Sequence, residues 1–249
     1  MRFIIMHKTN ADWEAGAIPS RELIARVGTL VGELAKANLL LGAEGLRASS
    51  HGVRLRFSGG TRTVSKGPFK GENELPAGFS ILRVGSLDEA MEWASRQAAV
   101  LGDVEIDIRP VTEAWDIGMI PKPENVTTQR YMALRKATAD SEAGVPLSPK
   151  QQAEMARLID ETKRTGVHLA TETLRPSARG RRYKNSRDGV RVMDGPFAES
   201  KELIAGYVIV SAESLEEAAR WATRYIAAVE GDEVDLREAE EGGGGPAQP

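Results

Sequence analysis

Residues 66–82 read KGPFKGENELPAGFSIL, and residues 194–210 read DGPFAESKELIAGYVIV. Matches continue at the same offset on both sides of this pair: RFIIMHKTNADWEAG with RYMALRKATADSEAG, LGAEGLRASSHG with LATETLRPSARG, and SLDEAMEWASR with SLEEAARWATR. About a third of the aligned positions are identical, and ordered matches along a whole half of a chain identify a tandem repeat. The chain therefore consists of two copies of one unit.

The repeat sets the domain organisation. Copy one spans residues 1–110 and copy two spans residues 129–238, each close to the commonest size of a domain. Residues 111–128 contain prolines and show no clear hydrophobic periodicity, which predicts a semi-stiff linker. Residues 239–249, AEEGGGGPAQP, have few apolar groups and are expected to form a disordered tail.

The composition is typical of a globular protein. The chain has 249 residues, of which 41% are hydrophobic, so it can bury a substantial core. No apolar run approaches the roughly 18 residues of a membrane span and no signal peptide is apparent, so we expect a soluble, cytoplasmic protein without a membrane partner. The 33 basic and 36 acidic residues give a net charge of −3, which disfavours nucleic acid as a partner. The absence of cysteine excludes disulfides and thiolate nucleophiles.

Each copy has the hydrophobic pattern of strand, helix, strand, hairpin, strand, helix and strand. In copy one we expect strands at residues 3–6 and 39–41, a hairpin at 53–65, strands at 78–84 and 105–109, and helices that start near Ser20 and Ser86. In copy two the same elements are expected at 131–134, 167–169, 181–193, 206–212 and 233–237, with helices that start at Ser148 and Ser214. Serine is a preferred residue at a helix N-cap because its hydroxyl accepts a hydrogen bond from an otherwise unpaired N–H group.

Without the hairpin, the order of elements is βαββαβ, which predicts an α+β, ferredoxin-like unit with a four-stranded antiparallel sheet. The two helices of such a unit cover one face of its sheet and leave the other face bare. We expect the second copy to cover that face, so that the two sheets meet face to face in an intrachain pseudo-dimer. A side-by-side arrangement, with a homodimer covering the sheets instead, is the alternative.

The segment Asp194–Glu202, DGPFAESKE, closely resembles the signature of the DGPFAETKE family, a branch of the YCII-related proteins. The resemblance covers both halves and implies a dimeric α/β-barrel fold. Relatives in the wider superfamily include lactone isomerases and dehalogenating lyases with a pocket between helices and sheet. Some relatives are thought to use a histidine near the start of the first helix, but Pro19–Glu22 and Leu147–Lys150 contain none. Genes of this family often lie beside those of extracytoplasmic-function sigma factors, which implies a regulatory context.

Asp194 is the candidate for proton transfer, because a carboxylate beside a Gly-Pro turn is held rigidly and burial in a cleft would raise its pKa. The alternative is that its side chain only caps its own turn. Copy one has Lys66 at this position, so the two copies cannot perform identical chemistry. The Gly195-Pro196-Phe197 sequence recurs as 67–69 and is expected to be structural.

A second group of polar residues is predicted to bind an anionic ligand. Arginine can hold a carboxylate or phosphate through two parallel hydrogen bonds. The group comprises Glu172, Arg175, Ser177 and Arg191 in copy two, with Glu44, Arg47 and Ser49 as the copy-one equivalents of the first three. The basic hairpin at 181–193 would attract an anionic ligand, RNA or an acidic protein surface, or it is simply a solvated face.

The leading hypothesis is a protein that binds a small anionic metabolite in a cleft, acting as a cofactor-independent lyase or isomerase. Arg175 would hold the anion and Asp194 would move a proton. The alternative is a non-catalytic regulatory module that binds a sigma factor or another regulatory protein. No metal site is expected, since the three histidines lack the spacing of metal ligands, and no cofactor motif is present. The sequence is compatible with a homo-oligomer.

Overall fold

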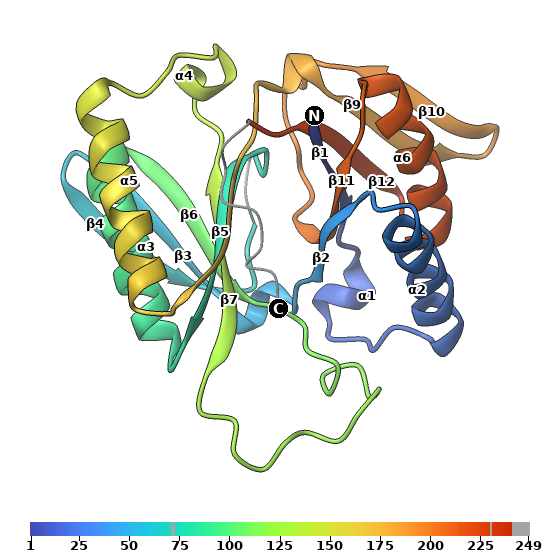
Figure 1. Ribbon diagram of the computed structural model, residues 1–249, viewed down its shortest axis with the longest axis horizontal. Coiled ribbons are helices and arrows are strands. Elements are labelled where there is room, and N and C mark those ends of the chain that lie inside the picture. The colour runs from blue at the N-terminus through green and yellow to red at the C-terminus, as the bar shows by residue number, and fades with distance from the viewer. Residues whose placement is uncertain (71–72, 230, 241–249) are drawn as a thin grey trace.

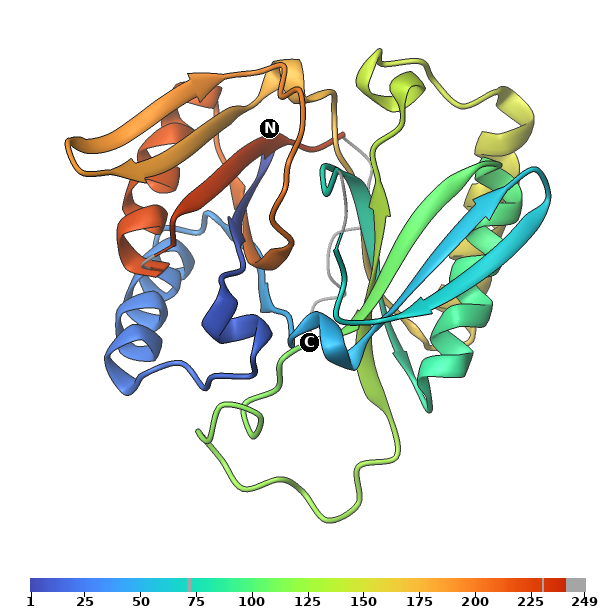
Figure 2. The same cartoon turned by 180° about the vertical axis from the view of Figure 1, so that it is seen from behind.

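The structure is a computed structural model that describes residues 1–70, 73–229 and 231–240. It has four layers: two six-stranded antiparallel sheets lie face to face, and a pair of long helices covers the outer side of each sheet (Figures 1 and 2). This arrangement confirms the predicted α+β fold of two ferredoxin-like units in an intrachain pseudo-dimer.

Each sheet places a hairpin beside four central strands. In spatial order, sheet I contains β10 (Gly189–Asp194), β9 (Arg181–Ser186), β12 (Glu233–Glu238), β1 (Arg2–Lys8), β11 (Ile204–Ser211) and β2 (Leu40–Gly45). Sheet II contains β4 (Thr61–Lys66), β3 (Val53–Ser58), β6 (Val104–Pro110), β7 (Gln129–Lys136), β5 (Pro76–Val84) and β8 (His168–Thr173).

The two copies exchange strands. The four central strands of each sheet follow the ferredoxin-like order of last, first, third and second strand, but strands one and two come from one copy and strands three and four from the other. All six strand pairings among these central strands therefore join copy one to copy two. The predicted boundaries separate the two repeats in the sequence, but each sheet of the fold contains strands from both repeats.

The linker explains the pairing in sheet II. Residues 111–128 connect β6 to β7, and these two strands are antiparallel neighbours in sheet II, so the linker is the long loop at the bottom of Figure 1. Consecutive strands usually lie next to each other, because a short connection restricts where the second strand can pair. The chain changes from one sheet to the other at residues 46–52 and 174–180, which we call the crossover segments.

The helices pair across the copies as well. The long helices are α2 (Arg21–Lys36), α3 (Leu87–Leu101), α5 (Pro149–Arg164) and α6 (Leu215–Val229), and the short ones are α1 (Ala11–Glu14), α4 (Ala139–Glu142) and the 3₁₀ turns η1 (Ser49–His51) and η2 (Ser177–Arg179). α2 packs with α6, and α3 packs with α5. The predicted helix starts are confirmed, since the hydroxyl groups of Ser20, Ser86, Ser148 and Ser214 each accept a hydrogen bond from a backbone N–H three residues later.

Three apolar cores hold the layers together. One core lies between sheet I and α2 with α6, and another lies between sheet II and α3. The third lies between the sheets and includes Ile4, Met6, Phe79 and Ile81, which are all at most 4% exposed, so face-to-face packing is confirmed. Within the described part of the chain, no helix combines the length and apolar character required to cross a membrane.

The predicted tail begins with two ordered residues. The Ala239 amide donates to the Arg2 carbonyl (2.9 Å), and the Glu240 amide donates to the Thr173 carbonyl (2.8 Å). The remainder of that prediction, residues 241–249, lies outside the described residues.

Candidate functional site

The Gly-Pro-Phe segments are tightly packed against the crossover segments. A Cβ atom at Gly67 would lie 1.8 Å from the Ser49 carbonyl oxygen, and one at Gly195 would lie 1.8 Å from the Ser177 carbonyl oxygen. Both Gly-Pro bonds are cis, and neither glycine has a positive φ. The predicted structural role of these segments is confirmed, but the glycines are required by close backbone approach and not by an unusual φ.

Ser49 and Ser177, both predicted to bind ligand, are fully buried at the centre of these contacts. The Ser49 hydroxyl donates to the Glu14 carboxylate and accepts from the Phe69 amide. The Ser177 hydroxyl donates to Glu142 and accepts from the Phe197 amide in the same way. Both hydroxyls therefore join a short helix to the Gly-Pro-Phe segment.

Buried ion pairs recur in both copies. Arg54 donates two hydrogen bonds to Asp107 and stacks on the Phe69 ring at 4.7 Å. The same contacts join the equivalent residues of copy two, Arg182, Asp235 and Phe197, with a ring distance of 4.4 Å. The first strand of the opposite copy adds a lysine to each cluster, Lys136 to Asp107 and Lys8 to Asp235. These clusters bind the exchanged strands together.

Glu44 and Glu172, also predicted to bind ligand, form ion pairs between the sheets. Glu44 on β2 pairs with Arg130 on β7, and Glu172 on β8 pairs with Arg2 on β1. Burial raises the pKa of Glu172 to about 7, and the nearby Arg2 opposes this shift. Burial also raises the pKa of Glu44 against the opposing effect of Arg130. Both carboxylates connect the two layers at equivalent positions.

Asp194 lies at the end of edge strand β10 with its side chain 78% exposed, and it pairs with Arg181 at 2.9 Å. Arg191, on the same strand, is also exposed. The backbone next to Asp194 contacts the Ser177 segment, whereas Glu172 and Arg175 engage Arg2 and Glu238. Within the described residues, the structure gives no contact that brings Asp194 to those two side chains.

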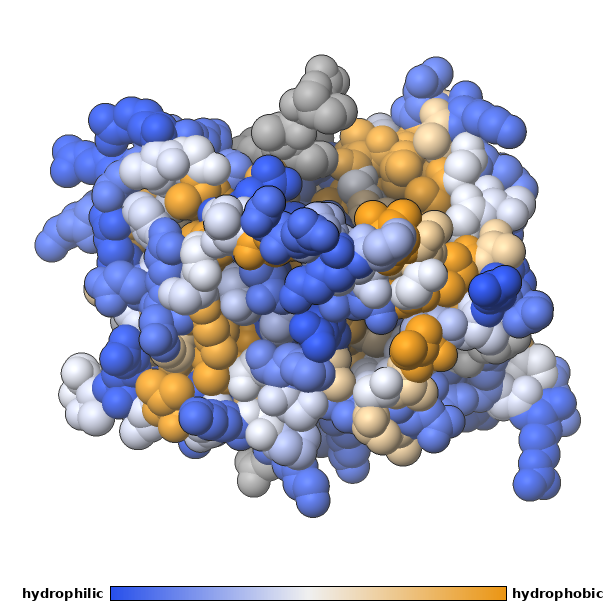
Figure 3. Space-filling view, turned by 90° about the horizontal axis from the view of Figure 1, so that it is seen from below, coloured by the Kyte–Doolittle hydropathy of each residue, from blue (hydrophilic) through white to orange (hydrophobic). Residues whose placement is uncertain are grey.

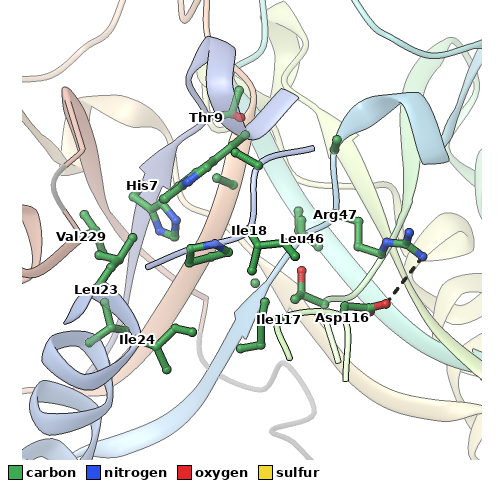
Figure 4. A pocket seen from close by; sticks show the side chains of 18 of the residues that line it. His7, Thr9, Ile18, Leu23, Ile24, Leu46, Arg47, Asp116, Ile117 and Val229 are labelled. Carbon is green, nitrogen blue, oxygen red and sulfur yellow. Dashed lines mark ion pairs between the residues drawn. The ribbon is translucent and has the colours of Figure 1, made fainter. Parts of the chain in front are cut away.

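A cavity of about 500 Å³ is lined mainly by copy one, with Ala205 and Val229 from copy two and residues of the linker. It is bounded by the end of β1, helices α1 and α2, the first crossover segment and the start of the linker (Figure 4). Its apolar lining includes Trp13, Ile18, Leu23, Ile24, Val27, Val31, Leu46, Ile117, Met119 and Val229. Its polar lining includes His7, Thr9, Glu14, Arg47, His51, Arg109, Thr112 and Asp116.

The lining residues Ile18 and Met119 are 67% and 60% exposed, so they border the opening of the cavity. Seen from the linker side, apolar side chains reach the surface in separate patches among polar residues (Figure 3). The cavity therefore opens to the surface beside the linker.

Arg47 is the predicted site residue that lines the cavity. Its backbone carbonyl accepts a hydrogen bond of 3.0 Å from the buried Arg109, which fixes the backbone at this point. Its side chain extends to Asp116, where Nη1 and Oδ1 are 3.9 Å apart, and to His51, where Nη2 and Nε2 are 3.3 Å apart. These contacts are long for an arginine, so its guanidinium can still form short hydrogen bonds to an anion.

The equivalent residue of copy two is held more closely. Arg175 Nε lies 3.1 Å from Glu238, and Arg179 Nε lies 2.6 Å from the other oxygen of the same carboxylate. The position that corresponds to Glu238 in copy one is Pro110. Arg47 therefore lacks the carboxylate that neutralises Arg175, although the backbone around the two arginines is the same.

His7 lies across the cavity from the Arg47–Asp116 pair, as Figure 4 shows. Its Nδ1 is 2.9 Å from the Tyr225 hydroxyl, and the Trp13 ring packs edge-on against it. Burial lowers the pKa of His7 to about 3, so the imidazole is neutral at physiological pH. A neutral ring whose Nδ1 is engaged can offer its other nitrogen to a polar group of a ligand.

The corresponding region of copy two has different side chains. Arg135 replaces His7, and its Nη2 donates to the Ala77 carbonyl at 3.2 Å. A Cβ at Gly78 would lie 3.1 Å from Arg135 Nη2, and one at the equivalent Gly206 would lie 2.7 Å from His7 Cε1, so the guanidinium of copy two takes the place of the imidazole of copy one. Gln151 replaces Leu23, and its side-chain amide donates to the Val100 carbonyl.

Most of the site was not predicted from the sequence, including His7, the apolar residues of α2, the linker residues and α1. The linker contributes Thr112, Asp116, Ile117 and Met119 to the cavity wall, and α1 contributes Trp13 and Glu14. The linker residues carried a signal, because the segment contains Trp115, Ile117, Met119 and Ile120, an apolar content that a purely solvated linker does not need.

The fold and the cavity define a tandem ferredoxin-like protein with an apolar pocket beside one helix layer. A YCII-related domain model matches residues 1–113 and 129–234, so the chain belongs to the YCII-related family, as its signature segment predicted. No curated protein matches the chain. A solved aminotransferase from Brucella abortus, bound to the co-factor PLP, is 14% identical over 55% of this chain and 70% of that chain. The TM-score of this match is 0.11, which does not indicate a shared fold.

Proposed function

We propose that this protein binds one small amphipathic anion, an apolar body with a carboxylate or similar group, in the cavity of copy one. The observation that carries the proposal is Arg47, whose loosely paired guanidinium borders a largely apolar space of about 500 Å³. Cavities of about 300–1,000 Å³ with apolar walls and a few polar groups are typical of small-molecule sites.

The positions of the polar groups indicate how such a ligand would lie. The anionic group would bind Arg47 near the linker, and the apolar body would lie along Leu23, Ile24 and Val27 of α2. A polar atom at the far end would meet His7. The predicted anion binding thus moves from Arg175 to its copy-one equivalent.

The environment of His7 favours binding over proton transfer. A general base is most effective when its pKa is close to the working pH, and the pKa of His7 is about 3. The Tyr225 hydroxyl is a poor source of protons as well, because burial raises its pKa. A lyase or isomerase reaction would need an acid or base that the ligand or another group supplies.

Isothermal titration calorimetry with matched pairs of compounds tests the proposal. 3-Phenylpropionate and octanoate provide an anion on an apolar body, and 3-phenylpropionamide and octanamide are their uncharged counterparts. We expect at least one carboxylate to bind with one molecule per chain, and Arg47→Ala to weaken its affinity about tenfold or more.

Arg175→Ala is the matched control, since it removes the same side chain from the equivalent position of copy two. It should leave the affinity for the carboxylate within about twofold of wild type, a change well below the tenfold that a lost charged contact gives. Equal losses in the two arginine variants, or equal affinity for acids and amides, would contradict the proposed site.

A further inference from the structure

The anion position in front of Arg47 already contains a carboxylate of the protein. Asp116 Oδ1 lies 3.9 Å from Arg47 Nη1, and the dashed line in Figure 4 marks this ion pair at the side of the cavity. Their side chains are 19% and 31% exposed, so the pair is partly shielded from water. A separation of 3.9 Å is an ionic contact but exceeds hydrogen-bond distance.

Asp116 belongs to a compact part of the linker. Its Oδ2 accepts a hydrogen bond from the Glu113 amide (3.0 Å), and its own amide donates to the Glu113 carbonyl (2.9 Å). The Met119 amide donates to the Ala114 carbonyl at 2.9 Å. One carboxylate oxygen therefore holds the turn, while the other faces Arg47.

Resting on the proposed function, we propose that Asp116 is a built-in counter-anion of Arg47, which an anionic ligand must displace, and that it favours anions that form two hydrogen bonds to arginine over anions that form one. A carboxylate, sulfonate or phosphate can form two short parallel hydrogen bonds to one guanidinium. Such a group replaces the long Asp116 contact with shorter ones. An uncharged ligand has no anionic group to replace the Asp116 carboxylate at Arg47. An anion that forms only one hydrogen bond to Arg47 gains too little binding energy to displace Asp116.

Copy two supports this interpretation by contrast. Glu238 lies 3.1 Å from Arg175 and also binds Arg179, so that carboxylate is fixed by two arginines. Asp116 contacts one arginine at longer range, and it comes from a connection and not from a strand of the sheet. Displacing Asp116 requires less rearrangement than displacing Glu238.

Two fluorescent probes with one aromatic body separate charge from shape. 8-Anilino-1-naphthalenesulfonate carries an anion, and N-phenyl-1-naphthylamine is the same molecule without the sulfonate. We expect Asp116→Asn to bind the sulfonate probe about three- to fivefold more tightly than wild type, the upper part of the range that loss of a partly exposed ion pair gives. The affinity for the uncharged probe should stay within about twofold, because Asp116 does not oppose it.

The Asp116→Asn side chain keeps an oxygen that can accept the Glu113 N–H, so the substitution removes the charge and preserves the turn. Glu124→Gln is the control for net charge: Glu124 is an exposed residue of the same linker, and its substitution should change neither affinity. Unchanged or weaker sulfonate binding by Asp116→Asn would overturn the counter-anion proposal.

Arg47→Ala distinguishes this failure from failure of the site itself. If Arg47→Ala selectively loses the sulfonate probe while Asp116→Asn gains nothing, the anion site stands and the role of Asp116 is rejected. If Arg47→Ala treats the two probes alike, or neither probe binds wild type, the proposed site is rejected and the counter-anion proposal with it.

Discussion

The cavity wall of copy one and the equivalent surface of copy two lie on the same backbone, yet they contain different side chains. His7 and Leu23 line the cavity in copy one, whereas Arg135 and Gln151 extend polar groups that bind backbone carbonyls in copy two. The buried contacts around the Gly-Pro-Phe segments are the same in both copies. The signature segment therefore maintains the fold, and a few residues outside it determine where a ligand fits.

The cavity also distinguishes the two arginines, because Arg47 lines it and the equivalent Arg175 does not. Arg47 and Arg175 occupy equivalent crossover segments, but only the latter has a strand carboxylate within 3.1 Å. A repeat can therefore keep a residue type at a position while its electrostatic partner changes. The availability of an arginine for a ligand depends on that partner as much as on the arginine.

The largest expected effect concerns the architecture that the copies share. Gly67→Ala and Gly195→Ala should each reduce the free energy of unfolding by about 3 kcal/mol or more, because the new Cβ would overlap a backbone carbonyl and force the crossover segment to move. Urea denaturation followed by circular dichroism measures both changes. Tolerance of alanine in one copy alone would show that the two segments are not structurally equivalent.

An intermediate effect concerns a residue that differs between the copies. The unfolded chain protonates His7 near pH 6.5, whereas the folded chain does so only near pH 3. Since the unfolded state binds more protons between these values, stability due to His7 falls as the pH is lowered from about 6.5 to 3. At pH 5 the loss is about 2 kcal/mol, and His7→Gln should remove it.

The measurement is the difference in unfolding free energy between wild type and His7→Gln at pH 7, 6 and 5. Glu172 acts in the opposite direction, because its raised pKa of about 7 stabilises the folded state as the pH falls towards 4.5. Its contribution is present in both proteins and cancels in the difference. Arg135→Gln in copy two should give a difference that does not vary with pH, since a guanidinium does not titrate in this range. Parallel profiles for wild type and His7→Gln would contradict the buried, neutral histidine.

Local patterns in the sequence predicted the elements well, because each depends on neighbouring residues. The serine caps at Ser20 and Ser148 and the apolar spacing behind them place the helices without any knowledge of the tertiary structure. The exchange of strands could not be predicted in this way. The two copies offer nearly the same strand as a partner, so the periodicity of β1 fits β11 as well as it fits β5.

The candidate site could be predicted only in part. The repeat predicts Arg47 as the equivalent of Arg175. The replacement of Glu238 by Pro110 affects the arginine only because the fold places the final strand beside the crossover segment, and the sequence does not show that contact. The rigid Gly-Pro turn after Asp194 favours a site residue at this position, but the Asp194 side chain is 78% exposed in the structure. Exposure and distance depend on packing between segments that are remote in sequence, which no local pattern reports.

The smallest expected effect concerns two glycines of α2, only one of which lines the cavity. Gly28 and Gly32 both lie within this helix, and a Cβ at either position would meet no atom within 4 Å. Each glycine-to-alanine substitution should therefore stabilise the protein by about 0.5–1 kcal/mol, since alanine loses less backbone entropy in a helix.

Of these two glycines Gly28 lines the cavity and Gly32 does not, so Gly28→Ala alone of the pair places a methyl group where the ligand body would lie. Gly28→Ala should weaken binding of N-phenyl-1-naphthylamine measurably, whereas Gly32→Ala should leave it at the wild-type value. Thermal denaturation confirms that both variants gain stability, and probe titration compares their affinities. Identical affinities in the two variants would mean that the probe binds elsewhere, and this cavity would no longer explain how the two copies differ.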